Sequence, residues 1–246
     1  MPAPARRVRS VRLLVAACVL ASAGIADAQD SAIPAFKTVD SMEARMQGCV
    51  TCHGQSGQGT SNEYFPRIAG KPAAYLYNQL VAFRDGKREY PPMNYLVAYL
   101  PDAYLKEIAT YFSKQRPAYE AKQTGAVGPE VLARGSTLAL TGDPTKQLPA
   151  CINCHGPALT GMEPGIPGLA GLRTSYIIAQ LTRWRTGHRQ AAQPDCMKRI
   201  ADRLSESDVR AVASWLAAQD PPREASPMPV NLQGMPLSCG SQKAAP

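Results

Sequence analysis

Two pentapeptides in this chain share the pattern Cys-x-x-Cys-His, at residues 49–53 and 151–155. In an exported protein this spacing is typical of covalent haem attachment. The two thiols can add to the porphyrin vinyl groups, and the adjacent histidine can then reach the iron. The motif therefore predicts two haem c groups, attached through Cys49, Cys52, Cys151 and Cys154, with His53 and His155 as proximal iron ligands.

A redox-active Cys-x-x-Cys, a zinc site and a structural disulfide are the competing interpretations of this pattern. A thioredoxin-like site belongs to a βαβ unit, and a tetrahedral zinc site needs four ligands that converge. Two self-contained pentapeptides, each with its own histidine and far apart in the chain, fit neither arrangement. Haem attachment is the interpretation that explains the whole pentapeptide.

The first residues have the pattern of a secretory signal. Arginines precede an apolar stretch over residues 13–25, and Ala26-Asp27-Ala28 offers a small-x-small cleavage site. We therefore expect residues 1–28 to be removed and the mature protein to be periplasmic and soluble, since no later segment is apolar for long enough to span a membrane. Cys18 leaves a lipid-anchored alternative open, because Val15-Ala16-Ala17-Cys18 faintly resembles a lipobox.

The net charge gives little support to nucleic-acid binding. The formal charge of +8 includes the arginines of the predicted signal, and ionised haem propionates would offset most of the remainder. No basic stretch is interleaved with stacking aromatic residues, as a nucleic-acid surface would require. We expect no nucleic-acid partner.

The sequence around each pentapeptide occurs twice. Residues 66–70 match residues 167–171, and residues 75–80 match residues 176–181 at the same offset. Two copies are too few for a solenoid, in which repeats stack in series. The pattern therefore predicts two similar domains that arose by duplication.

Each copy has helical periodicity. Apolar residues recur at helical spacing over residues 74–84 and 103–112, and again over residues 209–216 of the second copy. Pro101-Asp102 and Ser205-Glu206-Ser207-Asp208 provide capping groups ahead of the last helix of each copy. No run alternates apolar and polar residues between hairpin turns, so the sequence favours an all-α fold.

Composition sets the expected boundaries. Residues 29–113 form the first domain and residues 130–219 the second. Residues 114–129 are polar and broken by glycine and proline, which is typical of a linker. Residues 220–246 are rich in proline, which predicts an extended tail.

The order of motifs within each copy resembles that of dihaem class I cytochromes c of the cytochrome c4 type. Each copy has Cys-x-x-Cys-His, Pro-x-x-Ala-Gly, Tyr-x-x-x-Gln-Leu, Gly-x-Arg, a methionine and a last helix ending in an aromatic-apolar pair. The resemblance covers nearly all of the mature chain apart from the linker and the tail. It implies two tandem class I cytochrome c domains, each wrapped around one haem with histidine and methionine as axial ligands.

Met93 and Met197 are the expected sixth ligands. They occupy equivalent positions ahead of the last helix of each copy, outside any helical stripe, and the other methionines have no such counterpart. A thioether ligand favours ferrous iron, and a filled coordination sphere keeps substrates away from the metal. Both properties suit an electron carrier.

The resemblance also implies residues that surround the haems. Pro66 and Pro167 look like the family proline whose carbonyl accepts a hydrogen bond from the proximal histidine. A set of tyrosines and arginines could bind the haem propionates, although solvated helix faces explain the arginines almost as well. The set consists of Tyr75, Tyr176, Arg84, Arg185, Arg88 and Arg189.

Cys196 and Cys239 remain once the haem and signal cysteines are counted. An even remainder in an oxidising compartment predicts a disulfide, which would hold the tail beside the methionine loop of the second copy. An alternative stays open because Cys196 adjoins Met197, and a thiolate ligand would lower the potential of the second haem.

Together these patterns favour a periplasmic carrier of single electrons. Its donor would be a quinol-oxidising complex or a dehydrogenase and its acceptor a terminal oxidase or another redox protein, each docked weakly and transiently. It would meet membranes only through respiratory complexes. A dihaem peroxidase, a thiosulfate dehydrogenase-like enzyme and a haem subunit of a membrane dehydrogenase are the alternatives.

Overall fold

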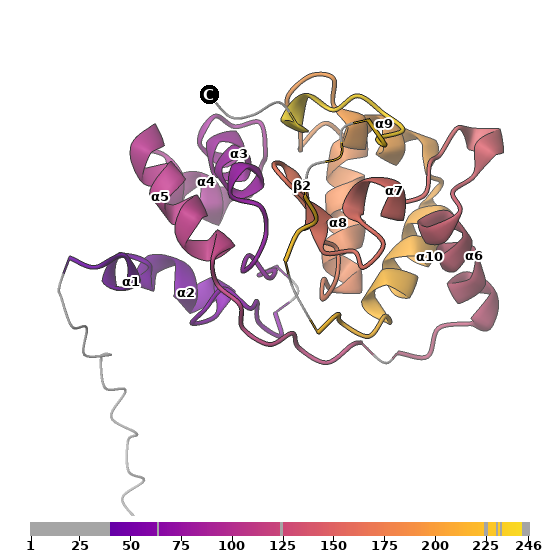
Figure 1. Ribbon diagram of the computed structural model, residues 1–246, viewed down its shortest axis with the longest axis horizontal. Helices are drawn as coiled ribbons and strands as arrows, with labels where there is room; N and C mark the ends of the chain where they lie inside the picture. Colours follow the sequence, from indigo (N-terminus) through magenta and orange to yellow (C-terminus); the bar gives the residue numbers. More distant parts are fainter. Residues whose placement is uncertain are drawn as a thin grey trace, which may run out of the picture. The chain divides into compact units, whose positions relative to one another are not determined.

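The fold is mostly helical (Figure 1), and the described residues form one two-stranded sheet. This computed structural model describes residues 40–62, 64–123, 125–223, 226–229, 231 and 233–242, all of which belong to one compact unit over residues 36–246. The predicted signal peptide lies outside the described residues. None of the described helices is long and apolar enough to span a membrane.

The first lobe, residues 40–113, has five helices among its described residues: α1 (Met42–Arg45), α2 (Gln47–His53), α3 (Ala73–Arg84), α4 (Pro91–Val97) and α5 (Asp102–Ser113). Helix α3 packs against α5 and α4. The predicted apolar stripe of the last helix is confirmed, since Leu105, Ile108 and Phe112 are buried in the core of this lobe.

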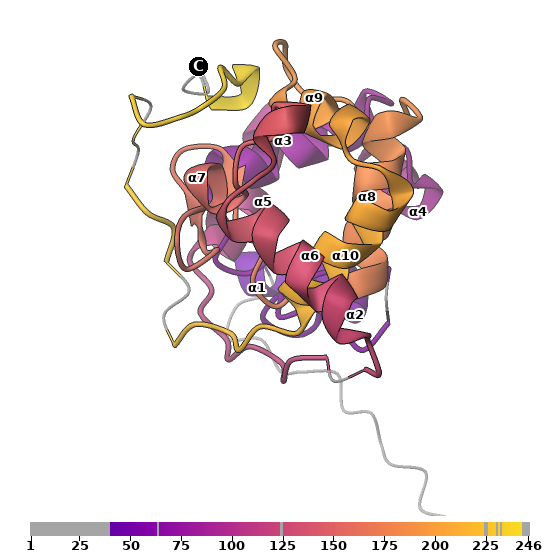
Figure 2. The same cartoon turned by 90° about the vertical axis from the view of Figure 1, so that its right-hand side faces the viewer.

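The second lobe, residues 129–219, repeats this arrangement with additions, and Figure 2 shows it in front. Helix α10 packs against α6 and α8, with the predicted stripe of Val209, Val212 and Leu216 buried. Its elements are α6 (Pro129–Leu140), η1 (Pro144–Lys146), α7 (Ile152–His155), β1 (Gly161–Met162), β2 (Ile166–Pro167), α8 (Thr174–Arg185), α9 (Cys196–Arg203) and α10 (Glu206–Ala217).

Two short helices differ from the sequence-based expectation. Met93 and Met197, expected outside helical stripes, lie within α4 and α9. Helix α4 begins with two prolines. Proline is tolerated in the first turn of a helix because the N–H groups there have no acceptor within the helix. Helix α9 begins where the Asp195 carboxylate accepts a hydrogen bond from the Lys198 backbone N–H.

The described parts of the linker and the tail pack against the lobes. Helix α6 begins at Pro129, which the sequence analysis assigned to the linker. In the tail, Met228 pairs with Met162 of β1 in a parallel bridge, and a 3₁₀ turn η2 (Gly240–Gln242) follows Cys239. The tail is therefore not uniformly extended over its described residues.

Candidate functional site

The two pentapeptide histidines have the same hydrogen bond. His53 Nδ1 lies 2.9 Å from the Pro66 carbonyl oxygen, and His155 Nδ1 lies 2.7 Å from the Pro167 carbonyl oxygen. Because a carbonyl oxygen can only accept, Nδ1 is the protonated nitrogen in both rings and Nε2 keeps its lone pair. An imidazole in this tautomer, held in place by the hydrogen bond at Nδ1, is suited to bind iron through Nε2.

Burial keeps both imidazoles neutral. It lowers the pKa of His53, and it lowers the pKa of His155 from 6.5 to about 4, in each case against the opposite effect of the proline carbonyl. At neutral pH neither ring carries a proton on Nε2. Both histidines are therefore in the form that ligates a metal.

A glycine directly after each histidine makes this geometry possible. Gly54 and Gly156 both have φ of +81°, in the region that residues with a Cβ rarely adopt. The helix that carries the cysteines ends at this point, and the chain turns back so that a proline carbonyl reaches the ring. The repeated glycine is thus part of how the sequence positions the histidine.

The pentapeptide cysteines do not resemble reactive redox thiols. None of the four is in a disulfide, and burial raises the pKa of Cys49 to about 11 and that of Cys151 to about 12. Reactive cysteines in redox motifs instead have a lowered thiol pKa. The surroundings of these thiols therefore argue against the redox interpretation.

A cavity lined mainly by the first lobe, with part of its wall from α8 of the second lobe, is large enough for a cofactor. Its volume is about 540 Å³, within the range of roughly 300–1,000 Å³ typical of cofactor sites. Cys49, Cys52, His53 and Met93 all line it, so the structure brings together the four residues expected to attach and ligate one haem. Most of its remaining wall is apolar, as expected for a porphyrin ring.

In the second lobe three of the residues expected near the haem lie against one apolar cluster. Cys151, Tyr176 and Met197 pack against the core formed mainly by α6, α8 and α10. Trp184 Nε1 is buried here without a hydrogen-bond partner among the described residues. An unpaired buried donor is costly, so this lobe too fits a bound group that carries acceptor oxygens.

Buried arginines join the two lobes. Arg88 of the first lobe donates to Gln79 Oε1 at 2.8 Å in its own lobe, and to the Tyr176 hydroxyl at 2.9 Å and Gln180 Oε1 at 2.8 Å in the second. The structure thus draws Tyr176, expected near a haem propionate, into a network between the lobes.

Arg189 of the second lobe makes the mirror-image contacts. It donates to Gln180 Oε1 at 2.8 Å, and to the Tyr75 hydroxyl at 3.2 Å and Gln79 Oε1 at 2.9 Å in the first lobe. The backbones of Arg88 and Arg189 also pair in an antiparallel bridge. The duplicated residues therefore meet each other at the junction between the copies.

Two of the expected propionate ligands lie elsewhere. Arg84 forms ion pairs with Asp85 at 3.0 Å and Asp102 at 2.6 Å, and it is absent from the cavity wall. Arg185 is exposed. Their positions favour the interpretation that these two arginines belong to solvated helix faces. Arg88 and Arg189, in contrast, are buried.

Two further buried cations were missed by the sequence analysis. Lys71 Nζ donates to the Gly168 carbonyl oxygen at 2.7 Å, and Arg67 donates to the carbonyls of Pro117 and Ala118 in the linker. The repeat contained a signal for both, because the counterparts of Arg67 and Lys71 in residues 167–172 are a glycine and a leucine.

None of the four buried cations, Arg67, Lys71, Arg88 and Arg189, is paired with a carboxylate in the part of the chain that the structure describes. Burying a charge without an opposite charge is unfavourable. Bound anionic groups, such as haem propionates, fit this excess of buried positive charge.

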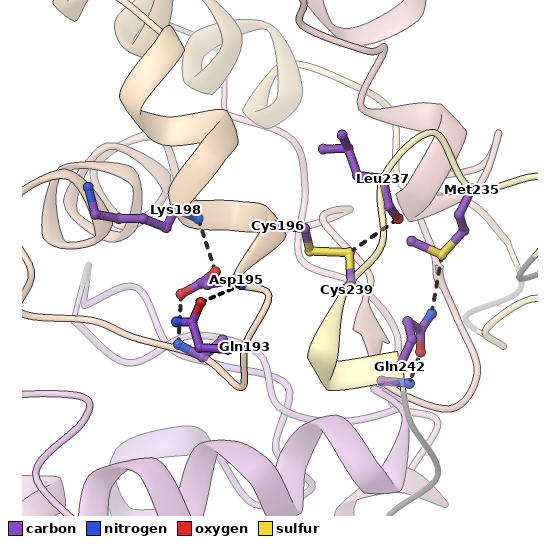
Figure 3. Close-up of a disulfide and its surroundings, with 10 residues drawn as sticks. Gln193, Asp195, Cys196, Lys198, Met235, Leu237, Cys239 and Gln242 are labelled. Carbon is purple, nitrogen blue, oxygen red and sulfur yellow. Dashed lines mark hydrogen bonds between the residues drawn. A yellow bond between two sulfur atoms is a disulfide. The ribbon is translucent and has the colours of Figure 1, made fainter.

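The predicted disulfide is confirmed. Cys196 and Cys239 are bonded to each other, and Figure 3 shows the bond between the start of α9 and the tail. The Cys196 sulfur is therefore bonded to Cys239 and is not a free thiolate beside Met197. The bond holds the tail against the segment that carries the expected methionine ligand.

Comparison with known proteins gives several relatives, although no protein-family model matches the chain. The chain is 40% identical over 173 residues to a thiosulfate dehydrogenase electron acceptor from Thiomonas intermedia (strain K12), covering 70% of this chain and 78% of the relative. It is 34% identical over 176 residues to cytochrome c4 from Pseudomonas aeruginosa, covering 71% of this chain and 85% of the relative.

Solved structures show similarity to the same two kinds of protein. Cytochrome c4 from Pseudomonas stutzeri aligns with a TM-score of 0.63 and 29% identity, covering 72% of this chain and 95% of that chain. A thiosulfate dehydrogenase from Marichromatium purpuratum aligns with a TM-score of 0.62 and 36% identity over 69% of this chain. The match spans only 36% of that enzyme's chain.

Proposed function

Because the chain belongs to the cytochrome c4 family of dihaem class I cytochromes c, we propose that it carries single electrons in the periplasm between a respiratory donor and an acceptor. As in that family, its cofactors are two haem c groups. When bound, each haem supplies a one-electron iron couple. The strongest support for the proposal is the duplicated histidine–proline hydrogen bond beside each cysteine pair.

The residues have paired roles in this proposal. The cysteines of each pentapeptide fix one haem, the histidine binds iron through Nε2, and the proline carbonyl holds the ring in place. A methionine then completes the coordination. The first haem is assigned to Cys49, Cys52, His53 and Met93, and the second to Cys151, Cys154, His155 and Met197.

Complete coordination favours a carrier over an enzyme. A histidine and a methionine on each iron would leave no position open to peroxide or another substrate, and the group would then supply electron transfer alone. The disulfide of Cys196 also removes the free thiolate that a thiosulfate enzyme could have used as a ligand. Transient docking to a donor and an acceptor then completes the function.

A thiosulfate-oxidising dehydrogenase is the donor that we favour. The relative from Thiomonas intermedia is named as an electron acceptor of thiosulfate dehydrogenase, and it is 40% identical to this chain. The aligned part of the Marichromatium enzyme is 36% identical. A quinol-oxidising complex remains the second candidate on the strength of the cytochrome c4 relatives.

Stopped-flow absorption spectroscopy can test this proposal. The oxidised, fully haem-loaded protein is mixed with thiosulfate alone and with thiosulfate plus a purified thiosulfate dehydrogenase. A carrier is reduced at both haems only when the dehydrogenase is present. Reduction by thiosulfate alone would instead indicate an enzyme. No reduction in either mixture, by a protein that dithionite reduces fully, would exclude this donor.

A further inference from the structure

Lys71 crosses from one lobe to the other. It lies between Gly70 and helix α3 of the first lobe, its side chain is buried, and its Nζ donates at 2.7 Å to the carbonyl oxygen of Gly168 in the second lobe. Gly168 follows Pro167, whose carbonyl accepts the hydrogen bond of His155. The ammonium group therefore ends one peptide unit away from the carbonyl that orients the proximal histidine of the second lobe.

Lys71 also forms part of the wall of the cavity that holds Cys49, Cys52, His53 and Met93. Its ammonium is nevertheless hydrogen-bonded to the turn that orients His155, so its charge is expected to act on the haem of the second lobe. A fixed positive charge near a haem destabilises ferric iron relative to ferrous iron, because the ferric form carries one more positive charge. The effect on iron needs no contact with the metal.

The two lobes differ at this position. The counterpart of Lys71 in the second copy is Leu172, a buried core residue, so the second lobe has no cation at this position. The next residue, Arg173, does reach the first lobe, where it donates to the Thr60 carbonyl oxygen at 3.2 Å. Gly168 stands where the first copy has Arg67, and a Cβ there would lie 2.6 Å from the Thr160 carbonyl oxygen. Residues 66–71 and 167–172 are otherwise similar, and both of these differences lie where the two segments contact each other.

We propose that Lys71, a residue of the first lobe, is a positioning and charge-supplying residue that raises the reduction potential of the haem held by the second lobe. Reduction would add one electron to that iron and lower its positive charge by one unit, with no bond made or broken. The proposal rests on the assignment of His155 to the second haem made under the proposed function. On this proposal, the contact between the lobes contributes to the difference between the two reduction potentials.

Burial determines the pH range in which Lys71 carries its charge. It lowers the lysine pKa from 10.5 to about 7, and the charge of Arg67 acts in the same direction. Potentials should therefore be measured at pH 6, where the side chain is protonated. At that pH, an anionic group or a reduced haem nearby favours the charged lysine, and by reciprocity the charged lysine favours the reduced haem.

The test is spectropotentiometric titration of three variants of the complete haem-loaded protein at pH 6. Lys71→Gln removes the charge but can still donate to Gly168, Lys71→Met removes both, and Lys71→Arg retains the charge. The first two should lower the ratio of reduced to oxidised second haem at a fixed potential by about tenfold, and Lys71→Arg should restore most of the loss. Lys122→Met is the matched control, because it removes one lysine charge from an exposed linker position, where solvent screens it.

Titration in a Met93→His background assigns the haems. This substitution should move the first haem to lower potential and leave the second as a separate transition. If Met93→His changes neither midpoint potential, the result contradicts the proposed ligand assignment of Met93. That result is distinct from a failure of the proposal for Lys71. An unchanged second haem in both Lys71→Gln and Lys71→Met would overturn the proposal, as would an effect confined to the first haem or an equal loss in Lys71→Arg.

Discussion

A haem-binding histidine must offer one nitrogen to iron and hold the other in place. The paired bonds from His53 to Pro66 and from His155 to Pro167 meet this need, and burial removes the competing proton. The two methionines expected to bind iron are where this chain would set the potential most strongly. A thioether there stabilises ferrous iron more than an imidazole does.

Replacing either expected sixth ligand should therefore change one haem at a time. Met93→His should lower the potential of the first haem, and Met197→His that of the second, because the softer ligand is lost in each case. The oxidised variants should each lose about half of the near-infrared methionine-to-iron charge-transfer absorption. A variant that retains the full absorption would show that the replaced methionine is not a ligand.

Sequence patterns single out the expected ligand residues more clearly than the residues that surround them. The pentapeptides and the paired methionines are local in the chain and repeated, so residue type and spacing suffice to predict them. The burial of Arg67 and Lys71 depends on how one lobe meets the linker and the other lobe, which no local pattern encodes. Arg84 and Arg88 are equally plausible by sequence, and they separate only because Arg84 faces Asp102 at the surface.

At the scale of elements, the start of α10 is the best-defined helix terminus in the second lobe. The Ser205 hydroxyl accepts from the Asp208 backbone N–H, and the Asp208 carboxylate accepts from the Ser205 backbone N–H. Arg134 and Lys146 also contact this carboxylate. These hydrogen bonds hold the pKa of Asp208 well below its usual range although burial alone would raise it. The sequence predicted capping groups in this segment, but not the two cations that reach Asp208 from α6 and η1.

Asp208→Asn should destabilise the second lobe by about 1–3 kcal/mol at pH 7, the range for loss of a cap and of charged hydrogen bonds. The sign with pH follows from the lowered pKa. The carboxylate adds stability above the unfolded value near 3.9, and this contribution is lost as pH falls through the folded value. Urea unfolding should show a difference between Asp208→Asn and the unmodified protein that shrinks below pH 4.

Asp220→Asn is the matched control, because Asp220 is 82% exposed and pairs only with Lys122 among the described residues. Exposed pairs of this kind contribute about 0–1 kcal/mol. A loss of stability in Asp220→Asn equal to that in Asp208→Asn would contradict the role of the buried capping network.

At the scale of the whole molecule, the two copies are joined by contacts that one copy alone could not make. Backbone bonds from Glu89 to His188 and from Gln190 to Lys87 flank the buried arginine network, and Lys71 adds a separate contact. The duplication was visible in the sequence, but the meeting of Arg88 with Arg189 was not. A repeat shows that two units are alike and does not show which of their faces meet.

The tail adds a covalent constraint on the second lobe. The disulfide joins residues separated by 43 positions, and closing a loop of that size stabilises a fold by about 3–4 kcal/mol in the chain-entropy model. Replacing both Cys196 and Cys239 with serine should therefore lower the melting temperature of the second lobe. The visible spectrum should stay unchanged, because neither sulfur binds iron. A changed spectrum with an unchanged melting temperature would contradict this role.

Spectropotentiometric titration of the unmodified haem-loaded protein, followed from the visible to the near infrared, tests the central claim most directly. The account predicts two one-electron reductions per chain, with methionine-to-iron charge-transfer absorption that decreases through both. A single reduction per chain, or a reduction with no change in that absorption, would contradict the assignment of a histidine- and methionine-ligated haem to each lobe.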